Sequence, residues 1–187
     1  MKIIYGLKNV VCSKYTIKQD GSYEYATPFK IPGAVSLSLS TSGDSNEFFA
    51  DDVIYHSSNA NQGYEGDLEI ALIPEEFKTD ILGETKDSNG ALIENADAEQ
   101  NGFALGFEVS GDVKARRIWF YNCNASRPNV DAKTKEKSIT PSTEKLTIKA
   151  MPRLNDHAIK VVMELTDSNK AQYDSFFSEV YEKTASV

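Results

Sequence analysis

The sequence has few of the residues that carry metal or redox chemistry. It contains two cysteines and two histidines among 187 residues. Cys12 and Cys123 lie far apart and form no CxxC pair, so their spacing favours neither a zinc site nor a disulfide framework. We expect two buried free thiols, and no metal or other cofactor.

Basic residues are also in deficit, because 20 Lys and Arg against 28 Asp and Glu give a formal net charge of -8. Neutralising phosphates requires clustered basic side chains, so we expect DNA to be repelled rather than bound. No run approaches the ~18 consecutive apolar residues of a membrane span, and Met1 to Gly6 lack the apolar core of a signal peptide. We therefore expect a chain made in the cytoplasm, with no membrane partner.

Recognisable catalytic motifs are missing as well. The chain has no GxSxG, Walker or GxGxxG pattern, and His56 and His157 belong to no metal-binding spacing. Asp67 and Glu69 share one face of an expected strand, as paired acids do in some glycosidases, but a solvated polar face is the simpler interpretation. The sequence thus predicts a protein that is not an enzyme.

What the sequence does contain is two-residue alternation of apolar and polar side chains, which is typical of strands with one buried face. Hydrophobic residues make up 40% of the chain, enough for a packed core. Asp20 and Gly21 suit a tight turn between the first two segments. The expected strands cover residues 8–18, 22–30, 34–41, 66–73, 103–109, 116–123, 145–151 and 158–165.

Two segments have helical signals. Pro74, followed by Glu75 and Glu76 and ended by Gly83, predicts a short helix. An apolar stripe at helical spacing predicts a second helix over residues 168–181, packed against the body. We expect a single domain over residues 1–187, mainly β: an antiparallel β-sandwich or barrel-like domain with one or two flanking helices. Residues 41–63 are expected to form a long excursion, an assembly arm or loop.

Several ordered blocks of sequence resemble one known family. The blocks are Ile31 to Ser38, Phe48 to Asp52, Asn61 to Leu72, Ile81 to Glu84, Phe103 to Leu105, Gly111 and Asp112, Arg116 and Arg117, Tyr121 to Cys123, and Arg127 and Pro128. They are similar to the major tail proteins, or tail tube proteins, of long-tailed bacteriophages of Gram-positive bacteria. The resemblance runs from about Tyr5 to Met151.

The resemblance implies a structural virion protein that assembles with itself into stacked six-fold rings. Such rings form the tail tube, which surrounds a tape measure protein, joins other tail proteins and later conducts DNA without binding it specifically. A net negative charge suits such a tube. Neighbours in a ring would also close open strand edges. The candidate assembly interface comprises Phe48, Phe49, Asp51, Asp52, Tyr55, Asn61, Tyr64, Arg116 and Arg127.

An alternative is a monomeric ligand- or carbohydrate-binding β-sandwich. Trp119 and Tyr121 would form its aromatic platform, and the acidic loop 83–102 would supply a calcium site. Within that loop, Asp87 to Gly90 resemble part of a calcium loop, although Ala96 occupies the position that needs a bidentate glutamate. The same aromatic residues lie among arginines, which favours ion pairing within a sheet or at a subunit interface over nucleic-acid stacking.

Overall fold

The structure is a computed structural model that describes residues 6–43, 45–50, 53–109, 111, 114–130 and 142–184. Its elements are β1 (Leu7–Ile17), β2 (Tyr23–Tyr25), β3 (Phe29–Lys30), β4 (Ala34–Ser42), β5 (Ser45–Ala50), β6 (Val53–Asn59), β7 (Gly63–Ile70), α1 (Glu75–Asp80), β8 (Thr85–Lys86), β9 (Leu92–Ile93), β10 (Phe103–Val109), β11 (Arg117–Ala125), β12 (Glu144–Met151), β13 (Lys160–Met163) and α2 (Lys170–Asp174). The predicted fold class, mainly β with one or two flanking helices, is confirmed.

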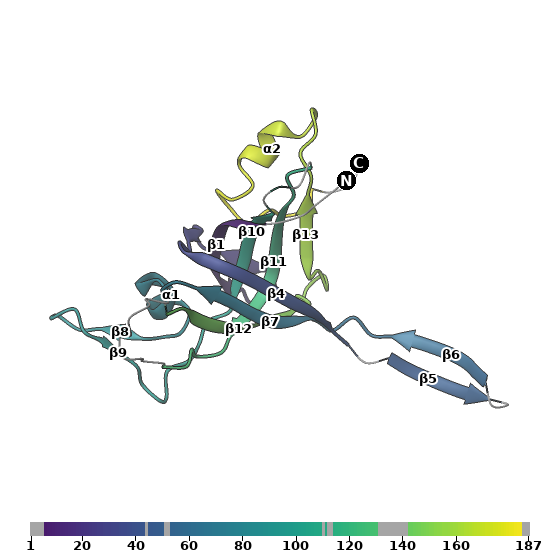
Figure 1. Cartoon of the computed structure of the whole chain (residues 1–187), viewed down its shortest axis with the longest axis horizontal. Helices are drawn as coiled ribbons and strands as arrows, with labels where there is room; N and C mark the ends of the chain where they lie inside the picture. Colours follow the sequence, from purple (N-terminus) through teal and green to yellow (C-terminus); the bar gives the residue numbers. More distant parts are fainter. Residues whose placement is uncertain are drawn as a thin grey trace, which may run out of the picture.

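Nine of the strands in the described residues form one antiparallel sheet, in the order β2-β1-β10-β11-β12-β7-β4, with β3 added to β1 and β13 added to β11. Strands β4 and β7 cross β1, β10 and β11 steeply (Figure 1). The two halves of the sheet therefore face each other across the core, as in a sandwich. In the described part of the chain, β4 pairs with β7 alone, so the sheet is open and does not close into a barrel.

The main core fills the space between these halves. It is built from alternate side chains of the facing strands, together with one side of α1. Its fully buried members include Cys12, Leu68, Ile70, Phe77, Ile81, Phe103, Leu105, Leu146 and Ile148. Cys123 is buried in the same core, and both cysteines are free thiols, as predicted.

The predicted N-terminal hairpin is present, with Tyr15 opposite Tyr25 and Ile17 opposite Tyr23. At its turn, the Asp20 carboxylate accepts a hydrogen bond from the Ser22 backbone N–H at 2.9 Å. Gly21 has a φ of 80°, which a residue with a Cβ adopts only with strain. The turn chemistry read from the sequence therefore fixes this hairpin.

The strands β10 and β11 differ from the simple alternation, because both of their faces are buried. Phe103 and Leu105 point into the main core, whereas Ala104, Trp119 and Tyr121 belong to a second cluster on the other face. That second face is covered by the C-terminal segment, residues 170–182, which contributes Phe176 and Val180 among others.

The second helix is much shorter than predicted, and the expected span of residues 168–181 is wrong in extent. Only Lys170–Asp174 is helical, and turns follow. Trp119 donates its indole N–H to the Phe176 carbonyl at 2.8 Å, and the Tyr121 hydroxyl donates to the Tyr181 carbonyl at 2.8 Å. These carbonyls accept hydrogen bonds from side chains of the sheet and are not directed along a helix axis. The apolar stripe is nevertheless packed against the body, as expected.

Two of the expected strands end earlier than the alternation of the sequence predicts. Strand β7 stops at Ile70, so Leu72 is 67% exposed rather than buried, and Leu165 lies beyond β13 and is 43% exposed. The first helix begins at Glu75, with Pro74 as its N-cap rather than its first residue. Among the helices that the structure describes, none is long and apolar enough to cross a bilayer.

Candidate assembly surfaces

The most distinctive feature of the chain is a two-stranded arm, formed by β5 and β6, that projects from the body (Figure 1). It runs from Ser45 opposite Asn59 to Ala50 opposite Val53. Within the described residues these two strands pair only with each other. The predicted interface residues Phe48 and Phe49 lie on β5 and Tyr55 lies on β6, whereas Asp51 and Asp52 lie outside the described residues.

The base of the arm is closely packed. Strand β4 ends opposite the start of β7, where Ser42 pairs with Gly63, and the Gln62 N–H donates to the Ser42 carbonyl at 2.9 Å. A Cβ at Gly43 would collide with the carbonyl oxygen of Ala60. The predicted interface residue Asn61 is exposed here, and its side-chain oxygen accepts a hydrogen bond from the Gly63 N–H at 3.2 Å. These contacts fix where the arm leaves the sheet.

An apolar groove of about 510 Å³ lies beside the open edge of β4. Its lining comes from both halves of the sheet and includes Leu37, Leu39, Tyr64, Phe107, Ile118 and Phe120. Leu37, Leu39, Phe107 and Ile118 are only partly buried, although they pack against the main core. We call this feature the seam groove, because it lies where the sheet fails to close.

Tyr64, another predicted interface residue, forms part of the seam groove. Its hydroxyl accepts a hydrogen bond from Lys160 Nζ at 2.8 Å, and its ring meets Phe120 edge-on at 5.2 Å. Val35 lies at a break in the register between β4 and β7 and is 55% exposed in the lining. The sequence pattern predicted an apolar face for β4, but not that this face stays half uncovered.

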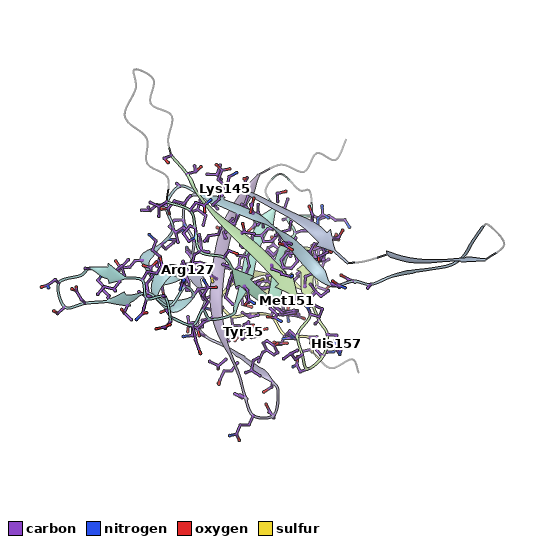
Figure 2. All side chains as sticks on the ribbon, turned by 90° about the horizontal axis from the view of Figure 1, so that it is seen from below. Tyr15, Arg127, Lys145, Met151 and His157 are labelled. Carbon is purple, nitrogen blue, oxygen red and sulfur yellow. The ribbon has the colours of Figure 1, made fainter. Side chains whose placement is uncertain are left out.

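The two predicted interface arginines lie elsewhere. Arg116 is half-buried in the turn before β11, where its carbonyl accepts a hydrogen bond from the Val109 N–H at 3.1 Å. Arg127 forms an ion pair with Glu94 at 3.2 Å and donates to the Asn95 carbonyl at 3.3 Å. Figure 2 shows Arg127 on the side of the body away from the arm. The structure therefore brings Asn61 and Tyr64 together near the arm, but not Arg127.

The neighbouring Arg117 takes part in ion pairing within the sheet. Its Nε lies 3.2 Å from a Glu108 carboxylate oxygen, and Lys8 reaches the other oxygen at 3.0 Å. Burial by itself raises the pKa of Glu108, but the hydrogen bonds from Asn9 and Lys8 and the charge of Arg117 outweigh it and lower the pKa. The charged side chains of this region thus stabilise the sheet.

The aromatic platform required by the alternative ligand-binding reading does not lie on the surface. Trp119 is 0% exposed and Tyr121 is 3% exposed, because the C-terminal segment covers them. The guanidinium of Arg153 lies 4.1 Å from the centre of the Tyr121 ring. A sugar could not stack on these rings without displacing that segment.

The acidic loop contains the small β8–β9 hairpin, and its calcium-like sequence serves a backbone turn. The Asp87 carboxylate accepts hydrogen bonds from the N–H groups of Asn89 at 2.9 Å and Ala91 at 2.8 Å. Among the described residues no three His, Cys, Asp or Glu side chains are grouped to hold a metal ion.

Burial raises the pKa of both cysteine thiols, so neither is poised as a thiolate nucleophile.

The outer face of β4, β7 and β12 carries mainly polar and charged side chains, and we call it the polar face. Glu65 lies opposite Lys149, and Glu69 lies opposite Lys145. Asp67 accepts a hydrogen bond from the Thr147 hydroxyl at 2.8 Å. Hydrogen bonds from Thr143 and Ser36 lower the pKa of Glu69, which keeps it ionised. Asp67 and Glu69 are thus held by neighbouring hydroxyls on an exposed polar surface, as the solvated-face interpretation expects.

Comparisons with known proteins give a family match and a similar solved structure. A family model described as phage tail tube protein matches residues 1–153. The comparison with curated proteins gives no match. Among solved structures, the chain is similar to the cryo-EM structure of the anti-feeding prophage cap (AFP tube terminating cap), at 11% identity and a TM-score of 0.39, over 88% of this chain and 95% of that chain.

Proposed function

The chain belongs to the phage tail tube protein family, and on that premise we propose that it assembles with itself into six-fold rings that stack into a hollow tube. It is a structural protein of the phage tail, and self-association is implied by the family. In this proposal the tube surrounds a tape measure protein, joins other tail proteins and conducts DNA. The chain acts through its surfaces, without catalysis.

The observation that carries the proposal is the family match over residues 1–153, which spans the arm and all of the seam-groove lining except Lys160. Two features of the structure support it. An isolated two-stranded hairpin is marginally stable in water, so the arm gains stability from a neighbour. Strand β4 is a long edge without charge or proline, and such an edge is an aggregation hazard unless it is covered.

The proposal that DNA passes through the tube is supported by the polar face. Its central strand β7 carries Glu65, Asp67 and Glu69, and the adjacent β4 carries serines. A surface of this kind offers DNA no aromatic platform for stacking and no excess of positive charge. We propose that this face lines the lumen, where DNA slides without being held.

Negative-stain electron microscopy of the purified protein across a concentration series tests the assembly. We expect six-fold rings, and at higher concentration tubes, without any added ligand. Sedimentation velocity on the same samples should show the monomer fraction falling as concentration rises, by mass action. A chain that remains monomeric at hundreds of micromolar would contradict self-assembly.

A further inference from the structure

We propose that the seam groove is the docking site for the β5–β6 arm of a second copy of this chain. Each copy would then donate its arm to one neighbour and accept an arm from another. This inference rests on the proposed function, because it takes from it that the chain associates with a second copy of itself. It adds which two surfaces are in contact.

The groove has the properties of a surface that is covered in the assembled state. It is apolar, about 510 Å³ in volume, and its lining residues Leu37 and Leu39 are only partly buried. The unpaired edge of β4 runs beside it, so an incoming strand could hydrogen-bond to that edge while its side chains enter the groove. Large exposed apolar surfaces with a polar rim mark interaction sites.

The arm has the matching chemistry. Residues 45–59 include Phe48, Phe49, Val53 and Ile54, and they contain no lysine or arginine. The same stretch of sequence is acidic, with Glu47 before the two phenylalanines and two aspartates between Ala50 and Val53. The charged member of the groove lining is Lys160, which is basic. An apolar, acidic hairpin therefore complements an apolar groove with a basic side chain.

The geometry assigns donor and acceptor to different copies. The arm continues β4 and β7 beyond the body and points away from it (Figures 1 and 2), whereas the groove lies along β4 on the body itself. A chain therefore cannot place its arm in its own groove. Because the two surfaces are unlike, the contact is heterologous, and heterologous contacts build rings or open filaments rather than closed dimers.

Two variants separate the surfaces. The acceptor variant lacks residues 44–59 and joins Gly43 to Ala60 by a short Gly-Ser turn, which is feasible because Gly43 lies against the Ala60 carbonyl at the base of the arm. The donor variant keeps the arm and carries Val35→Glu and Leu39→Glu in the groove. A third protein carries Val35→Glu alone. Because Val35 is 55% exposed, this substitution should leave the fold intact, so it still tests the groove if the double variant misfolds. Val130→Glu, at a 97% exposed valine outside the groove lining, is the matched control.

Each variant is first checked for folding by circular dichroism and urea unfolding, and then studied by sedimentation velocity. We expect the acceptor and donor variants to remain monomeric alone where the parent chain self-associates, and to form a 1:1 complex when mixed. Val35→Glu alone should weaken self-association at least about tenfold, whereas Val130→Glu should leave it unchanged.

The inference is overturned if the folded acceptor variant still self-associates like the parent chain, or if the mixture yields no 1:1 complex. If the parent chain forms rings but the mixed variants form no 1:1 complex, the arm-in-groove contact is overturned and the proposed function stays intact. A 1:1 complex without parent rings would support the contact and overturn the six-fold assembly. The absence of both would overturn both.

Discussion

Glu108 illustrates how single charges hold this sheet together. Its side chain is 7% exposed and lies between Lys8 at 3.0 Å and Arg117 at 3.2 Å, with Asn9 donating a hydrogen bond at 2.9 Å. These partners come from β1 and β11, the two strands that flank β10 in the sheet. A carboxylate in this position links three strands, whereas an exposed surface pair contributes little.

The lowered pKa of Glu108 predicts a specific pH dependence. Because its folded pKa lies below the unfolded value of ~4.3, its contribution is present above that value and is lost as pH falls through the folded pKa. We expect Glu108→Gln to lower the free energy of unfolding by about 1–3 kcal/mol at pH 7, and by less at pH 3, which lies below the unfolded pKa. Urea unfolding at both pH values measures the difference.

The matched control is Glu24→Gln, which removes the pairing of Glu24 with Lys18 at 3.4 Å on the surface, where the two side chains are 61% and 50% exposed. That substitution should change stability little at either pH. An equal loss for Glu108→Gln at pH 3 and pH 7 would show that its role is packing rather than charge.

At the scale of elements, the C-terminal segment is the part that local patterns describe least well. Its apolar stripe is genuine, since Tyr173, Phe176 and Val180 are buried. However, it packs as one short helix and successive turns, because alternate residues of β11 hydrogen-bond to its backbone carbonyls. Arg117, Trp119 and Tyr121 donate to the carbonyls of Tyr173, Phe176 and Tyr181.

This arrangement predicts that Phe176 anchors the segment. The side chain is 1% exposed and its ring lies 5.6 Å from that of Tyr181. We expect Phe176→Ala to destabilise the fold by about 3 kcal/mol, as for other buried Phe→Ala changes, and to increase hydrogen exchange across residues 170–182. Gln172→Ala, at an exposed position of the same segment, should have almost no effect. Unchanged exchange in Phe176→Ala would contradict the anchoring role.

At the scale of the whole molecule, the position of the polar face within an assembly can be tested with added charge. The variant Ser36→Lys, Ser38→Lys and Ser40→Lys places three basic residues on the exposed serines of β4. The control places three on the exposed acidic loop, as Ser88→Lys, Ala91→Lys and Ala96→Lys. As free chains, both should gain weak DNA binding that declines with salt.

In assembled tubes, only the loop variant should bind duplex DNA added from outside, because the polar face would be enclosed. A gel-shift assay on purified tubes, with the parent protein as a blank, measures this. Equal binding by tubes of the two variants would place the polar face on the outside of the assembly.

The sequence by itself determined the fold class, most strands, the hairpin at Asp20 and Gly21, and the family. These features depend on neighbours in sequence: alternation over a few residues gives a strand with one buried face, and a turn needs residues that tolerate its φ. The family resemblance, likewise, rested on short blocks of residues in order. The candidate interface residues were proposed on the same local basis, and they stay predictions.

Only the tertiary structure decided which apolar faces are covered. Trp119 was a candidate surface platform, but it is buried by Phe176, which comes from a distant part of the sequence. Leu37 and Leu39 alternate as in any half-buried strand, yet they line an open groove because β4 pairs on one side alone in the described chain. Burial depends on contacts between distant segments, and local patterns do not contain that information.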